Sequence, residues 1–176
     1  MDEDVAYLIT VKHFAFEEHQ KKNQLYGESP YNFHLNDVVY NAEKYIDEIQ
    51  DDSVKLQVIA AAYGHDLLED CVSYNDILKV FGHIAADIIY DVTNELGKDR
   101  DEKAAKTLPK TAKNRLAIYI KCCDRLSNTT YSKNSGSGMY QKYVKEYGVF
   151  RSYLRSDGLY PKLWSDLDKI NSFISQ

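Results

Sequence analysis

Apolar residues recur at helical spacing along most of this sequence, and that periodicity is the strongest constraint on how the chain can fold. Between His34 and Ile49 they occupy positions i, i+3, i+4 and i+7, which places them on one face of an amphipathic helix. The residues on that face are Leu35, Val38, Val39, Ala42, Tyr45, Ile46 and Ile49. No segment alternates apolar and polar residues convincingly, as a half-buried strand would. The sequence therefore predicts an all-α fold built as a helical bundle.

Further helices follow from the same spacing and from residues that cap helix ends. Residues 51–53, Asp-Asp-Ser, offer N-cap oxygens for a second helix that carries His65 and Asp66 near its end. An apolar stripe leads directly up to Asp124, which predicts another helix there. Two closing helices are expected to complete the bundle towards residue 176.

The segment from Lys98 to Arg115 interrupts this pattern. Its apolar spacing fades, Pro109 interrupts any helix, and positive charges outnumber negative ones. This composition predicts a basic, mobile connection between helices. Two interpretations stay open: a solvated linker, or a lid that steers phosphate groups towards a site.

Length and charge narrow the class of protein and the class of partner. A chain of 176 residues has the usual size of one domain, so we expect a single domain over residues 1–176. The start is acidic and no apolar run approaches the roughly 20 residues that cross a bilayer, which predicts a cytoplasmic protein without a membrane partner. The formal net charge of -5 argues against nucleic acid as a partner but leaves a small anionic substrate open.

Residues 65–70, His-Asp-Leu-Leu-Glu-Asp, concentrate charge beside an apolar helix. One imidazole and three carboxylates in such surroundings need a compensating charge. A divalent cation provides it, because imidazole and carboxylate suit manganese, iron, zinc or a similar ion, and His65 and Asp66 are candidate ligands. His34 begins one amphipathic helix and Asp124 ends another, so both are candidates to reach the same ion from neighbouring helices.

Three motifs occur in a characteristic order. Residues 30–34 read Pro-Tyr-Asn-Phe-His, residues 65–70 read His-Asp-Leu-Leu-Glu-Asp, and residues 121–128 read Lys-Cys-Cys-Asp-Arg-Leu-Ser-Asn. They resemble Pro-Tyr-x-x-His, His-Asp-x-x-Glu-Asp and Lys-x-x-Asp-Arg/Lys-Leu-x-Asn of the HD-domain metal-dependent phosphohydrolases. Within that superfamily the chain looks most like the RelA/SpoT-type hydrolases of the alarmone (p)ppGpp, especially their small single-domain versions. The resemblance covers roughly residues 5 to 150 and implies an HD-domain helical bundle.

The resemblance also implies a reaction and a set of site residues. The metal ligands would be His34, His65, Asp66 and Asp124, around one divalent cation, most simply Mn²⁺. Glu69 and Asp70 would be the catalytic carboxylates that orient and deprotonate a metal-activated water. The substrate would be a small phosphorylated nucleotide, hydrolysed to GDP or GTP and pyrophosphate, and Asn128 matches a family position that contacts it.

Two departures from the family pattern keep the choice of nucleotide open. Leu35 stands where the family usually has proline, and Gln-Lys-Lys-Asn-Gln at residues 20–24 stands where it has a Gln-Arg-Arg-Lys element. Lys21 or Lys22 is expected to bind phosphate there, although lysine does not stack on a base as arginine does. The alternatives are NADPH, a nucleoside monophosphate or a cyclic nucleotide as substrate. A non-catalytic nucleotide-binding module stabilised by its metal is a further alternative.

Overall fold

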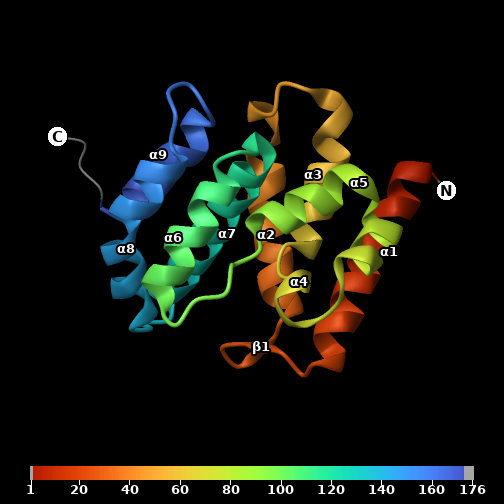
Figure 1. Cartoon of the computed structure of the whole chain (residues 1–176), viewed down its shortest axis with the longest axis horizontal. Helices are drawn as coiled ribbons and strands as arrows, with labels where there is room; N and C mark the ends of the chain where they lie inside the picture. The colour runs from red at the N-terminus through yellow and green to blue at the C-terminus, as the bar shows by residue number, and fades with distance from the viewer. Residues whose placement is uncertain (1, 173–176) are drawn as a thin grey trace.

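The structure, a computed structural model, describes residues 2–172 and is an all-α fold, as the periodicity predicts (Figure 1). Its α-helices are α1 (Glu3–Lys21), α2 (Asn32–Lys44), α3 (Lys55–Gly64), α4 (Leu67–Asp70), α5 (Tyr74–Val92), α6 (Arg100–Thr111), α7 (Arg115–Asn134), α8 (Met139–Leu154) and α9 (Pro161–Ile170). Two short 3₁₀ turns, η1 (Ile46–Glu48) and η2 (Asp52–Val54), join α2 to α3. The predicted closing helices are α8 and α9, and residues 173–176 lie outside the described residues.

The centre of the bundle is formed by α2, α3, α5 and α7. Helix α2 packs against both α3 and α7, and α5 packs against α3 and α7 (Figure 1). The predicted apolar face of α2 is buried, including Leu35, Val38, Val39 and Ala42. Because α2 lies against α3 and α7 at once, residues of all three helices can meet. No helix within residues 2–172 is both long and apolar enough to span a membrane.

A small hairpin corrects the expectation that the chain contains no strand. Strands β1 (Leu25–Tyr26) and β2 (Ser29–Pro30) pair antiparallel between α1 and α2. Strands of two residues are too short to show alternation in the sequence. Gly27 makes the turn with φ 62°, and a Cβ there would lie 2.1 Å from the Tyr131 hydroxyl, so both the backbone and the space require glycine.

The segment between Lys98 and Arg115 is also corrected, because most of it forms helix α6 rather than a mobile connection. The helix buries Thr107, Leu108 and Thr111, and the Thr111 hydroxyl donates to the Asp91 carbonyl at 2.7 Å. Because two of the buried residues are threonines, the buried face of α6 lacks the spacing of aliphatic residues that predicts an amphipathic helix. Tertiary packing thus outweighs the unfavourable effect of Pro109 within the helix.

Gly64, the residue before His65, lets α3 and α5 approach each other closely. A Cβ at this position would lie 2.6 Å from Ile89 Cδ1 and 2.8 Å from Phe81 Cε1. Both side chains are buried in the core, so neither can move aside without disturbing its neighbours. This close contact therefore fixes the position of the C-terminal end of α3, which His65 follows directly.

Replacing Gly64 by alanine should destabilise the protein by about 1–3 kcal/mol, the usual cost of overpacking a core. The free energy of unfolding in urea measures the effect. Gly148→Ala is the matched control, because nothing lies within 4 Å of a Cβ at that position of α8. The control should be neutral or stabilise by up to about 1 kcal/mol, since alanine favours helix over glycine. Equal stabilities of Gly64→Ala and the unaltered protein would contradict the close contact.

Candidate active site

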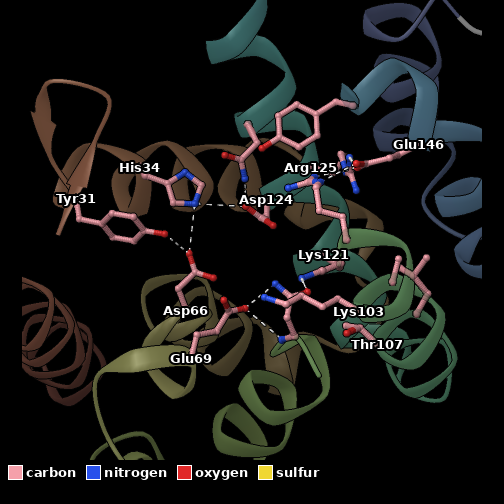
Figure 2. A pocket seen from close by; sticks show the side chains of 16 residues that line it. Tyr31, His34, Asp66, Glu69, Lys103, Thr107, Lys121, Asp124, Arg125 and Glu146 are labelled. Carbon is pink, nitrogen blue, oxygen red and sulfur yellow. Dashed lines mark hydrogen bonds and ion pairs between the residues drawn. The ribbon is translucent and has the colours of Figure 1, made fainter. Parts of the chain in front are cut away.

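The structure brings all four predicted metal ligands together where α2, α3, α4 and α7 meet, and Asp124 lies in the middle of α7 rather than at the predicted helix end. His34 lies in the first turn of α2, His65 caps α3, Asp66 precedes α4, and Asp124 lies within α7. The His34 Nε2 atom is 3.3 Å from Asp124 Oδ1 (Figure 2). The His65 Nε2 atom is 3.2 Å from His34 Nε2 and 3.1 Å from Asp66 Oδ2. Neighbouring ligands at right angles around a metal with bonds of about 2.1 Å are separated by about 3 Å. The ligand atoms of His34, His65 and Asp66 lie within 4.8 Å of one another and therefore have the spacing of a metal centre, and Asp124 lies beside both imidazoles.

The hydrogen bonds of the two imidazoles show that the donor set fits a cation. The Nδ1 atom of His65 is 2.9 Å from the Ala62 carbonyl, which can only accept, so in the neutral ring Nδ1 carries the proton and Nε2 a lone pair. His34 Nδ1 is 3.4 Å from Ser127 Oγ, whose hydroxyl donates to Asp37, so His34 has the same tautomer. Two imidazole lone pairs and two carboxylates thus face one point. Such a cluster of acceptors needs a divalent cation, or protons, between them.

Each carboxylate ligand is also held by a neighbouring side chain. The Tyr31 hydroxyl donates to Asp66 Oδ2 at 2.5 Å, and Asn128 Nδ2 donates to Asp124 Oδ1 at 2.5 Å. Asn128 in turn accepts a hydrogen bond from the Tyr26 hydroxyl of the hairpin at 3.0 Å. Partners of this kind orient metal ligands. Asn128, predicted to contact the nucleotide, lines the pocket and orients a candidate ligand as well.

The same carboxylates alter the proton affinity of the two imidazoles. Burial alone would lower the pKa of His34, but hydrogen bonds with Asp124 and Asp66 outweigh it and raise the pKa to about 9. Burial also opposes protonation of His65, yet the negative charge of Asp66 raises its pKa. A cation that enters the site must therefore displace protons from these rings.

Glu69, the first predicted catalytic carboxylate, lies in the same pocket beside Asp66 (Figure 2). Its Oε1 atom accepts hydrogen bonds from the Asn94 backbone N–H at 3.1 Å and from Asn94 Nδ2 at 2.7 Å. Partial burial, together with the negative charge of Asp66, raises the pKa of Glu69. A carboxylate with a raised pKa is suited to accept a proton. The side chain of Asp70 lies outside the described part of the structure, so its role stays a prediction.

A wall of four cations faces the candidate metal ligands across the pocket. Arg100 and Lys103 come from α6, and Lys121 and Arg125 come from α7 (Figure 2). Glu146 of α8 accepts from Arg100 Nε at 2.7 Å and from Arg125 Nη1 at 3.3 Å, which neutralises part of this wall. None of these four residues is among the site residues predicted from the sequence. The available signals were the basic segment that became α6 and the motif positions of Lys121 and Arg125.

Lys21 and Lys22, predicted to bind phosphate, do not line the pocket. Both are exposed at the end of α1, and Lys21 pairs with Glu18 at 2.6 Å. Nearer to the cluster on α1 is His19, which is buried and stacks on Tyr31 with ring centroids 4.5 Å apart. The phosphate-binding role of the two lysines stays a prediction, and other cations are better placed for it.

The raised histidine pKa predicts how metal binding depends on pH. Below the His34 pKa of about 9 the metal-free ring holds a proton, and each bound cation must displace it. If one proton is displaced, the dissociation constant for Mn²⁺ should therefore rise about tenfold for each unit by which the pH falls, and about a hundredfold if two are displaced. Isothermal titration calorimetry at pH 6, 7 and 8 measures this slope. A dissociation constant that stays constant over that range would argue against the predicted competition.

Comparisons with known proteins agree with the fold. No protein-family model and no curated protein matches this sequence. Among solved structures, the chain is similar to that described as "A metazoan ortholog of SpoT hydrolyzes ppGpp and plays a role in starvation responses". The TM-score is 0.76 at 23% identity, and the match covers 94% of this chain and 93% of that one. The resemblance that the motifs indicate is thus confirmed at the level of the fold: this chain folds as that ppGpp hydrolase does.

Proposed function

We propose that this protein is a divalent-metal-dependent phosphohydrolase that removes pyrophosphate from the 3′ side of (p)ppGpp, leaving GDP or GTP. The observation that carries the proposal is one pocket with two opposite sides. On one side His34, Asp66 and Asp124 line the pocket, with His65 in contact with His34 and Asp66, and on the other side four cations face them. The first side suits a divalent cation, for which Mn²⁺ is our candidate, and the second suits phosphate groups. The structural likeness to a ppGpp hydrolase supports this substrate class.

The metal ligands would come from separate elements that the bundle already holds together. His34 and Asp124 would hold the cation from α2 and α7, and His65 and Asp66 from the junction of α3 and α4. When bound, a divalent cation lowers the pKa of a nearby water and polarises a phosphate oxygen. The protein's own contribution is to keep these donors oriented before the cation arrives.

Glu69 is the group that would move the proton. Two hydrogen bonds from Asn94 hold one of its oxygens and leave the other available to a water. As a base, Glu69 takes a proton from the water whose oxygen attacks the phosphorus attached to the 3′ oxygen. The bond from that phosphorus to the 3′ oxygen breaks, and the proton passes to the 3′ oxygen. The products are pyrophosphate and a nucleotide with a free 3′ hydroxyl, with Asp70 as the second carboxylate of the pair.

The cations of the wall differ in how available they are to a phosphate. Arg100 and Arg125 are paired with Glu146, and Lys121 Nζ donates to the Val92 carbonyl at 2.9 Å. The exposed ammonium group of Lys103 makes no hydrogen bond or ion pair with the described residues. The pocket holds about 260 Å³, slightly less than the range of about 300–1,000 Å³ for small-molecule sites. Phosphate groups therefore fit inside, with the nucleoside extending through the mouth.

Incubation of the purified protein and Mn²⁺ with ppGpp should release GDP and pyrophosphate, separated by anion-exchange chromatography. NADPH, cyclic nucleotides and nucleoside monophosphates, tested in parallel, separate the substrate classes. If one of these compounds is hydrolysed and ppGpp is not, the proposed metal-dependent hydrolysis stands, but that compound replaces ppGpp as the substrate class. No turnover of any of them, with metal still bound, would favour the non-catalytic module.

Substitution Glu69→Gln should lower kcat by about 10²- to 10⁴-fold, the usual contribution of a general base. Metal content, measured by inductively coupled plasma mass spectrometry, should stay at one ion per chain, because Glu69 is not among the four converging donors. Glu43→Gln is the matched control, since Glu43 is exposed on α2 and does not line the pocket. Unchanged turnover in Glu69→Gln would exclude the base role, and loss of the metal would make Glu69 a ligand instead.

Substitution Lys103→Ala should raise KM for ppGpp about tenfold, the effect of losing one charged hydrogen bond, with little change in kcat. Because Lys103 is exposed and has no ion pair or hydrogen bond through its ammonium group among the described residues, removing its side chain should leave the fold intact. Lys113→Ala is the control, because Lys113 is exposed just beyond α6 and does not line this pocket. Steady-state kinetics of both variants measure KM for ppGpp. An equal KM in the two variants would contradict a contact between Lys103 and the substrate.

A further inference from the structure

Helices α2 and α7 face each other through two pairs of side chains that lie one helical turn apart. His34 and Asp37 are spaced by three residues on α2, as are Asp124 and Ser127 on α7, so each pair shares one helix face. In the first layer His34 Nε2 lies 3.3 Å from Asp124 Oδ1. In the second layer Ser127 Oγ donates to Asp37 Oδ2 at 2.5 Å. The second layer therefore lies directly behind the candidate metal centre.

Ser127 connects the two layers. Its Oγ atom is also 3.4 Å from Nδ1 of His34, on the edge of the ring that faces away from the metal centre. Because the Asp37 carboxylate can only accept, the hydroxyl proton points at Asp37 and the oxygen lone pairs remain for the Nδ1–H of His34. His34 is 1% exposed and Ser127 is fully buried, so bulk water cannot take over this contact. The connection runs from Asp37 through Ser127 to the imidazole.

The stacking contact of His34 cannot perform this task. The Tyr26 ring stacks on the imidazole with centroids 4.6 Å apart and planes 22° apart, which restricts tilting. Stacking does not distinguish one edge of the ring from the other, so a half-turn of the imidazole would remain allowed. A hydrogen bond to one particular nitrogen does distinguish them. His65 differs, because its Nδ1 is held by the backbone carbonyl of Ala62 at 2.9 Å.

We propose that Asp37 and Ser127 are positioning residues that set the tautomer and the ring orientation of His34 for metal binding. The role rests on the metal centre of the proposed function and is independent of which nucleotide is hydrolysed. Asp37 lies outside the three motifs, and residue 127 is an unspecified position within the third. A purely structural Asp37–Ser127 bond would tie α2 to α7 without affecting metal affinity. Metal affinity therefore separates the two roles.

The experiment measures Mn²⁺ binding to the metal-free full chain by calorimetry, without nucleotide. Ser127→Ala and Asp37→Ala should each weaken binding about 10- to 100-fold, as loss of a partner that orients a ligand does. Asp37→Asn should recover part of the loss, because its amide oxygen can accept the same hydroxyl proton. Ser132→Ala is the matched control, a buried serine of α7 that donates only to the Thr129 carbonyl at 3.1 Å. The control should bind Mn²⁺ within about twofold of the unaltered protein.

The double variant tests whether the two residues act in series. If Asp37 acts through Ser127, then Ser127→Ala with Asp37→Ala should bind no more than about twofold more weakly than Ser127→Ala alone. Fully additive losses, or unchanged affinity in both single variants, overturn the proposal. Should Ser127→Ala fail to fold, the half-buried Asp37 still provides the decisive variant. Absence of ppGpp turnover would refute the proposed function but would leave this binding result standing.

Discussion

The convergence of four acceptor atoms on one point is the constraint on which the rest of this structure depends. His34 and His65 are buried with their Nε2 atoms 3.2 Å apart, and the carboxylates of Asp66 and Asp124 complete the set. Groups of this kind repel one another unless a positive charge lies between them. The bundle must therefore hold them in place against their own repulsion. The tight contact of α3 and α5 at Gly64 and the double layer between α2 and α7 provide that rigidity.

The electrostatics of the pocket depend on local placement rather than on the total charge of the protein. The chain carries a formal net charge of -5, yet four cations gather on one wall of a single pocket. Glu146 binds two of them and ties α6, α7 and α8 together, so part of the positive charge is used for structure. The remaining positive charge faces the candidate metal ligands. An anionic ligand can thus be attracted by one wall while a cation is held by the other.

Two elements that sequence patterning did not predict complete the site. The hairpin of β1 and β2 brings Tyr26 over His34 and against Asn128, although its strands have only two residues each. Helix α6 brings Arg100 and Lys103 to the pocket, although two of its three buried residues are threonines. Neither element is stable by its own propensity. Each forms because the rest of the bundle offers it a surface on which to pack.

The sequence by itself determined the helical class, the buried face of α2 and the four candidate metal ligands that the fold brings together, because helical spacing and motif order are properties of the chain alone. It could not place the cation wall, and it assigned phosphate binding to Lys21 and Lys22, which the fold leaves outside the pocket. Only the tertiary structure decided that Asp37 and Ser127 meet behind His34. The physical reason is that spacing specifies which face of a helix a residue occupies, whereas the packing of helices distant in sequence specifies which faces touch.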